Sequence, residues 1–142
     1  MVDGLLLTDL PAEEAKEISE YARRCDVDYI SLVAPTTDEG RLQKIVEVSS
    51  GFLYLVSVLG VTGARERLES YTIKKLRWVK DRTRLPVAVG FGISKKEHVE
   101  RIVKEGADGV VVGSAFIDLI EKGASVEKLK SFALELKEGT FR

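Results

Sequence analysis

The chain has 142 residues, of which 44% are hydrophobic and 32% charged, and its formal net charge at pH 7 is −1. This length and composition predict a globular protein with a hydrophobic core and one domain, residues 1–142. We expect no membrane span, because no apolar run approaches ~20 residues, and we expect no secretion signal at the N-terminus. We also expect no nucleic-acid partner, because no basic patch is interleaved with aromatic residues.

The first predicted unit begins with a short apolar run, Gly4–Thr8, which ends at Asp9. Pro11 then predicts the start of a helix, with Glu13 and Glu14 in its first turn, where the positive end of the helix dipole favours acidic side chains. The apolar residues of this segment recur at helical spacing, which predicts one apolar face: Ala15, Ile18, Tyr21 and Ala22.

The second unit begins with a predicted buried strand, Tyr29–Ala34. In the helix after it, three apolar side chains are expected to face the core: Leu42, Ile45 and Val46. The third unit has a predicted strand at Phe52–Val58, a loop at Gly60–Gly63 and a helix at Tyr71–Asp81. Each strand is therefore followed by a helix in this part of the chain.

The fourth unit repeats this order. Its predicted strand is Pro86–Val89, and Ser94 and Glu97 have the spacing of a capping box, which predicts the start of the next helix. Gly106 is expected to end that helix, since glycine adopts the left-handed conformation found after helix ends.

The fifth unit begins with a predicted strand at Gly109–Val112. A short helix is expected from Ser114 to Gly123, and Ser125 is expected to cap the last helix. The spacing between successive strands is typical of βαβ units, and the continuous apolar runs predict a parallel sheet covered on both faces. Two α/β architectures fit this pattern: strands four to eight of an eight-unit (β/α) barrel, which is a partial TIM barrel, or a doubly wound sheet of five strands.

Small residues follow the last two predicted strands: Gly90 and Gly92 after one, and Gly113 and Ser114 after the other. In a β/α barrel the loops after the last two strands and the N-terminus of a short extra helix surround a phosphate group. Backbone N–H groups at these turns would bind the anion without a lysine or arginine. The alternative interpretation is that these residues form only tight turns at the strand ends.

Other chemistry finds little support in the sequence. Cys25 and His98 are the only cysteine and the only histidine, so we predict no metal site and no disulfide, and we expect Cys25 to be a bystander rather than a nucleophile. A chain without disulfides suits a reducing cytoplasm. A flavodoxin-like regulatory domain would need an acidic phosphate-acceptor cluster, for which Asp3 and Asp9 are poorly placed.

Several segments resemble the α subunit of tryptophan synthase in order and spacing, over essentially the whole chain. The most specific is the tyrosine-bearing strand 51–57 followed by Gly-Val-Thr-Gly at 60–63. The other segments that resemble this family are Asp3–Pro11, Ala34–Thr36, Val89–Ser94 and Gly109–Ala115.

The resemblance implies a lyase of tryptophan biosynthesis that cleaves indole-3-glycerol phosphate by a retro-aldol reaction to indole and glyceraldehyde 3-phosphate. A glutamate and an aspartate of the family transfer the protons, and both belong to its N-terminal part. No residue of this chain matches either carboxylate, so we predict no catalytic residue here and a chain that is inactive alone.

The resemblance assigns the binding residues to this chain. Four match the family's phosphate contacts: Gly63, Gly92, Gly113 and Ser114. Five match residues beside the indole or in the loops that close over substrate: Tyr54, Phe91, Leu32, Thr62 and Asp9. Asp9 matches an aspartate that orders the active-site loops and the contact with the β subunit, and it is not the catalytic base.

The implied partners are the β subunit of tryptophan synthase and the substrate. No cofactor is expected in this chain, because pyridoxal phosphate belongs to the β subunit. The alternative function is a non-catalytic phosphate-binding half-barrel or assembly module. Two open sheet edges, near Leu5 and Val111, would then favour self-association, because exposed strand edges invite pairing with another chain.

Overall fold

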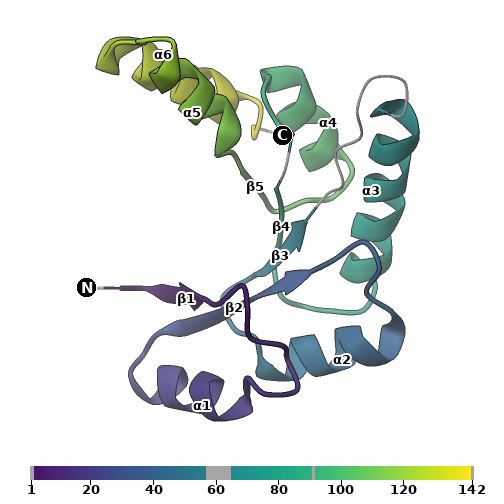
Figure 1. Cartoon of the computed structure of the whole chain (residues 1–142). Coiled ribbons are helices and arrows are strands. Elements are labelled where there is room, and N and C mark those ends of the chain that lie inside the picture. The colour runs from purple at the N-terminus through teal and green to yellow at the C-terminus, as the bar shows by residue number, and fades with distance from the viewer. Residues whose placement is uncertain (1, 57–64, 91, 142) are drawn as a thin grey trace.

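Five parallel strands form one sheet whose spatial order follows the order of the chain (Figure 1). The computed structural model describes residues 2–56, 65–90 and 92–141. The strands are β1 (Gly4–Leu6), β2 (Asp28–Val33), β3 (Leu53–Val56), β4 (Val87–Gly90) and β5 (Gly109–Val111). A doubly wound sheet reverses its strand order at a switch point, and this sheet does not. The structure therefore confirms the partial barrel.

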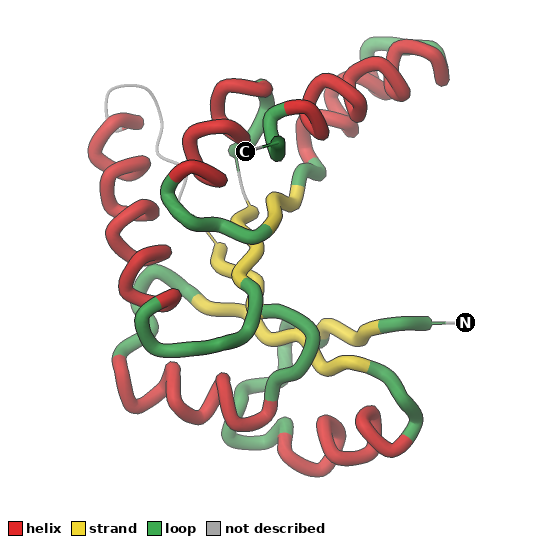
Figure 2. The backbone as a smooth tube through the Cα atoms, turned by 180° about the vertical axis from the view of Figure 1, so that it is seen from behind, coloured by secondary structure: helices red, strands yellow, loops and turns green. Residues whose placement is uncertain are grey.

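Helices connect the strands and extend beyond the last of them (Figure 2). They are α1 (Lys16–Arg24), α2 (Glu39–Val48), α3 (Arg65–Lys80), α4 (Lys96–Lys104), α5 (Ser114–Glu121) and α6 (Val126–Glu138). Each of the first four lies between two neighbouring parallel strands, as in successive βαβ units. The helix pair α5 and α6 follows β5, and α6 packs against α4.

The hydrophobic core lies between the helices and one face of the sheet. Alternate strand residues enter it, because successive side chains of a strand point to opposite faces. The buried strand residues of the main cluster are Val33, Leu53, Leu55, Val87 and Val89. They pack against helix residues, which are Leu42, Ile45, Leu76, Val79, Val99, Ile102, Val103 and Leu136. A smaller cluster beneath α1 contains Ala15, Tyr29 and Val48.

The opposite, concave face of the sheet is not fully covered by the described residues. In β3, Leu53 and Leu55 are buried, whereas Tyr54 and Val56 are only half-buried. The expectation that both faces are covered is therefore wrong for this part of the molecule. The strands are apolar throughout because a barrel also lines its interior with apolar side chains.

Helix α1 begins later than Pro11 predicts. The amides of Glu14 and Ala15 donate to the carbonyls of Pro11 and Ala12, which makes a pair of turns before the helix starts at Lys16. The helix consequently buries Ser19 and Ala22, together with its N-cap residue Ala15. The predicted inward residues Ile18 and Tyr21 are 39% and 64% exposed.

The ends of the later helices follow the sequence signals in part. Gly106 and Gly123 have φ angles of +107° and +74° after α4 and α5, and Ser125 caps α6 by accepting from the amide of Lys128. The capping box predicted for α4 does not form. Its N-cap residue makes no side-chain cap, and the amide of Ser94 instead donates to Nδ1 of His98 over 3.5 Å.

Candidate functional site

Two of the predicted phosphate-binding turns begin side by side, at the carboxyl ends of β4 and β5. Gly90 and Val111 are register partners in the parallel pair. Gly92 and Gly113 each lie two residues further along the chain, so both turns start from neighbouring positions at the carboxyl end of the sheet. Neighbouring strands are about 4.8 Å apart, which is close enough for two turns to share one anion.

The left-handed conformation of Gly92, with a φ angle of +72°, explains why glycine occupies this turn. Gly113 is the N-cap residue of α5, and its carbonyl accepts from the amides of Phe116 and Ile117 at 2.9 and 3.2 Å. The amides of Ser114 and Ala115 precede these hydrogen bonds, so they point out of the helix end, where the helix dipole favours a negative charge.

The rim formed by the turns at Gly92 and at Gly113 and Ser114 is accessible to solvent. Gly113 and Ser114 are both exposed, and nothing lies within 4 Å of the position that a Cβ atom would take on Gly113. The chemical groups offered here are backbone N–H groups and one hydroxyl. Together they can bind a phosphate dianion by charge-assisted hydrogen bonds, which contribute about 1.5–3 kcal/mol each.

The predicted indole-side residues that the structure describes lie on the concave face of the sheet. Leu32 of β2 and Tyr54 of β3 are register partners, which places them side by side. The ring of Tyr54 also covers Gly90 of β4, where a Cβ atom would overlap the phenol. Burial raises the pKa of the Tyr54 phenol above its ordinary value, so this side chain is a neutral, partly desolvated wall.

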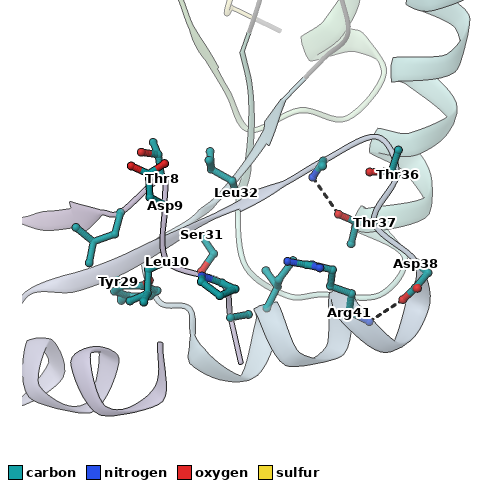
Figure 3. Close-up of a pocket in the computed structure, with 15 residues that line it drawn as sticks. Thr8, Asp9, Leu10, Tyr29, Ser31, Leu32, Thr36, Thr37, Asp38 and Arg41 are labelled. Atoms are coloured by element: carbon teal, nitrogen blue, oxygen red, sulfur yellow. Dashed lines mark hydrogen bonds between the residues drawn. The ribbon is translucent and has the colours of Figure 1, made fainter. Parts of the chain in front are cut away.

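A cavity of about 560 Å³ lies between the segment after β1 and the turn after β2 (Figure 3). Asp9 and Leu32 both line it and extend to the same side of β2, whereas Tyr29, Ser31 and Arg41 lie on the side that faces the helices. The structure therefore brings two predicted residues to one cavity, Asp9 from the segment after β1 and Leu32 from β2.

Sequence reasoning missed the polar residues that line this cavity from the β2 side: Thr36, Thr37, Asp38 and Arg41. Asp38 caps α2 by accepting from the amide of Arg41 at 2.8 Å. An aspartate directly before a helical pattern is an N-cap signal, so the start of α2 was predictable even though the cavity was not.

Three predicted site residues lie outside the described residues: Thr62, Gly63 and Phe91. Their roles remain predictions. Within the described part of the chain, no three histidine, cysteine, aspartate or glutamate side chains gather where they could hold a metal ion. No helix in the same part is long and apolar enough to cross a membrane.

Five consecutive parallel β/α units, with glycine turns after the last two strands and the short helix α5 after the last of them, define part of a β/α barrel. The family model described as tryptophan synthase alpha chain matches residues 1–141. The chain belongs to the tryptophan synthase alpha chain family.

Curated relatives carry the same name. The chain is 47% identical to the tryptophan synthase alpha chain of Methanopyrus kandleri over 142 residues, covering 97% of this chain and 52% of that relative. It is 50% identical to that of Methanothermobacter thermautotrophicus over 141 residues, covering 99% of this chain and 52% of the relative. The chain thus spans about half the length of the curated relatives it matches.

Solved structures agree with this assignment. The crystal structure of a tryptophan synthase complex from Pyrococcus furiosus matches with a TM-score of 0.84 and 44% identity, covering 96% of this chain and 55% of that one. A tryptophan synthase α-subunit structure from the same organism also gives a TM-score of 0.84, with 45% identity and coverage of 96% and 56%.

Proposed function

We propose that this chain provides the substrate-binding side of an indole-3-glycerol phosphate lyase. The observation that carries the proposal is the pair of neighbouring turns at Gly92 and Gly113, beside the N-terminus of α5. Membership of the tryptophan synthase alpha chain family supports the choice of substrate. Gly63 is proposed as a further donor to the phosphate, together with Gly92, Gly113 and Ser114.

The reaction breaks the carbon–carbon bond between the indole ring and the glycerol phosphate chain. The ring carbon must be protonated and a glycerol hydroxyl deprotonated before the bond breaks. In our proposal the turns anchor the phosphate while Leu32, Tyr54 and Phe91 hold the ring. Thr62 and Asp9 order the loops around the substrate. None of these residues is assigned proton transfer, and no residue of the chain matches the family's two proton-transferring carboxylates. In our proposal the chain of 142 residues therefore binds the substrate without cleaving it.

The proposed partner is the β subunit of tryptophan synthase, which receives indole and carries pyridoxal phosphate, whereas this chain needs no cofactor for its own part. Two matching structures from Pyrococcus furiosus are of a tryptophan synthase complex, which supports an assembly of this kind. We also propose a cytoplasmic location, where Cys25, which is exposed and unpaired, would stay reduced.

Charge reversal at the rim tests phosphate binding. Ser114→Asp places a carboxylate where the phosphate is proposed to lie, and we expect it to weaken binding of glycerol 3-phosphate by roughly tenfold or more, measured by calorimetry. The fold should be retained, because an acidic residue in the first turn of a helix is favourable. Ser125→Asp makes the same change at the N-terminus of α6 and should leave the affinity unchanged.

A turnover assay tests whether the chain binds the substrate without cleaving it. The purified chain should release no indole from indole-3-glycerol phosphate while still binding it. Release of indole by the chain would show that proton-transfer residues are present among the 142. Equal affinities of the wild type and Ser114→Asp for glycerol 3-phosphate would contradict the proposed phosphate site.

A second candidate function is an assembly module without catalysis. The observation that favours it is that β1 and β5 each pair with one strand only, so both edges of the described sheet have unpaired sides. Such edges are templates for pairing with another chain. This function and the first are compatible, because the turns and the edges are different surfaces.

A further inference from the structure

The turn after β2, residues Ala34–Asp38, forms some of its backbone hydrogen bonds within itself. The amide of Ala34 donates to Oγ1 of Thr37 at 3.0 Å, and the amide of Thr37 donates to the carbonyl of Ala34 at 3.0 Å. Asp38 caps the next helix. These contacts fix the inner shape of the turn, but not its position relative to the neighbouring unit.

Helix α3 supplies that second restraint. The hydroxyl of Tyr71 donates to the carbonyl of Pro35 at 2.9 Å, and Nζ of Lys75 donates to the carbonyl of Thr37. Tyr71 and Lys75 are four residues apart on one helix face, a rise of about 6 Å. These two donors, one helical turn apart, therefore hold two carbonyls of the turn that are two residues apart.

Lys75 is itself held by a cluster formed by Trp78 of the same helix and Arg82, which follows the end of that helix. Its Nζ atom lies 3.8 Å from the ring centre of Trp78, and the guanidinium of Arg82 lies 4.7 Å from that centre. Arg82 in turn forms an ion pair with Glu39 of α2 at 3.5 Å. Burial lowers the pKa of the Lys75 ammonium below its ordinary value, although Asp38 opposes this shift. A desolvated ammonium depends on its partners, and here they include the turn.

The position of this turn matters for the candidate site. The turn continues β2 directly after Leu32 and Val33, and it lines the same cavity as Asp9 and Leu32. A shift of the turn would move the carboxyl end of β2 and the apolar wall that Leu32 forms with Tyr54. It would leave the rim at Gly92 and Gly113, on the other side of β3, in place.

We propose that Tyr71 and Lys75 are positioning residues for the indole side of the ligand. Their hydrogen bonds to Pro35 and Thr37 hold the turn Ala34–Asp38 where Leu32 can contact the ring, and they do not affect the phosphate. This inference rests on the proposed function, because it assumes a ligand with both an aromatic ring and a phosphate group.

Two probes separate the two sides of the site. Glycerol 3-phosphate carries the phosphate alone, and indole-3-propanol phosphate carries the phosphate and the ring. Tyr71→Phe removes only the hydroxyl of a side chain that is 47% exposed, so the fold should be unaffected. We expect it to weaken binding of the ring-bearing probe roughly three- to tenfold, with glycerol 3-phosphate unchanged. Lys75→Met should act in the same way.

Matched controls use residues on exposed helix faces. Lys74→Met makes the same change one residue before Lys75, and Tyr21→Phe removes a hydroxyl from α1, where Tyr21 is 64% exposed. Neither should change the affinity for either probe. An equal loss for both probes in Tyr71→Phe, or no loss for the ring-bearing probe, would overturn the positioning role. A wild type that binds neither probe would instead refute the proposed function, and this inference with it.

Trp78 provides a signal that a purely structural role would not produce. It is the only tryptophan of the chain, so its indole N–H gives a single cross-peak in a ¹⁵N-labelled sample, and an unlabelled ligand adds none. Because Lys75 contacts both Trp78 and the turn, the ring-bearing probe should move this cross-peak in the wild type and move it less in Tyr71→Phe. An unmoved cross-peak in a wild type that binds the probe would contradict the coupling.

Discussion

Gly90 is buried under the ring of Tyr54, and a methyl group at this position would overlap the phenol. We predict that Gly90→Ala displaces Tyr54 and destabilises the protein by about 1–3 kcal/mol, the usual range for overpacking a core. Urea denaturation measures the change in the free energy of unfolding. Binding of indole-3-propanol phosphate should weaken as well, because Tyr54 forms part of the proposed ring-binding wall.

Gly109→Ala is the matched control for this change. Gly109 also lies in a strand, but its Cβ atom would meet Cβ of Ala88 at 3.7 Å, an ordinary van der Waals contact. The substitution should therefore be neutral or stabilise by up to about 1 kcal/mol, since alanine loses less conformational entropy on folding. If Gly90→Ala and Gly109→Ala have the same effect, the packing of Tyr54 on Gly90 is not the reason for the glycine.

The Tyr54 phenol should also ionise late. Burial raises its pKa above the ordinary value of 10.0, so the folded state retains the proton at a pH where the unfolded state loses it. The stabilisation is complete below about pH 10 and is lost as the pH rises through the folded-state pKa. The free energy of unfolding should therefore fall more steeply above pH 10 in the wild type than in Tyr54→Phe. Parallel slopes in the two proteins would contradict this.

The sequence predicts the turns of the site better than its side-chain contacts. Gly92 and Gly113 are recognisable because each follows an apolar run, and a strand end is a local feature. The contact between Tyr54 and Gly90 joins two strands that are distant in the sequence. Their pairing register decides which glycine lies under the ring, and a single sequence does not give the register.

At the scale of elements, Asp108 links β4, β5 and α3 at the amino ends of the strands. Its Oδ2 atom accepts from the amide of Val87 at 2.7 Å and from Nζ of Lys80 at 2.6 Å. We predict that Asp108→Ala destabilises the protein by about 1–3 kcal/mol, because the Val87 amide loses its acceptor. Ligand affinity should not change, since the proposed site lies at the opposite ends of the strands.

Two further variants separate the hydrogen bond from the ion pair. Lys80→Met removes the ion pair alone and should cost less than about 1 kcal/mol, because the pair is partly exposed. Asp81→Ala removes an exposed carboxylate directly after Lys80, in the turn that follows α3, and should have no effect. An Asp108→Ala protein as stable as Asp81→Ala would show that the bond to Val87 contributes nothing.

The strands were easier to predict than the helix ends. The starts of the predicted strands fall within a residue of the observed ones, because an apolar run bounded by polar residues has a clear beginning. Helix α3 begins at Arg65, six residues before the predicted Tyr71. Its first turns consist mainly of charged residues, so no apolar periodicity reveals them. Pro11 misled in the other direction, since proline also begins turns.

At the scale of the whole molecule, the described sheet has two edge strands, β1 and β5. Apolar side chains are exposed on the helices that follow them: Ile18 and Tyr21 on α1, and Ile117 and Ile120 on α5. An unpaired strand edge beside an exposed apolar helix face offers both backbone hydrogen-bonding groups and apolar side chains to another chain. The unpaired side of β5 in one copy is complementary to the unpaired side of β1 in another copy, because a parallel sheet continues by adding a strand and its helix together.

We therefore predict that the chain self-associates, with β5 of one copy beside β1 of another. Sedimentation at increasing protein concentration should show a shift from monomer to larger species. The double variant Ile117→Lys, Ile120→Lys should weaken association without unfolding the monomer, because these side chains are 56% and 58% exposed. Val126→Lys changes another exposed apolar residue, 76% exposed at the start of α6, and serves as the control. A wild type that stays monomeric at every concentration would refute the assembly function and leave phosphate binding unaffected.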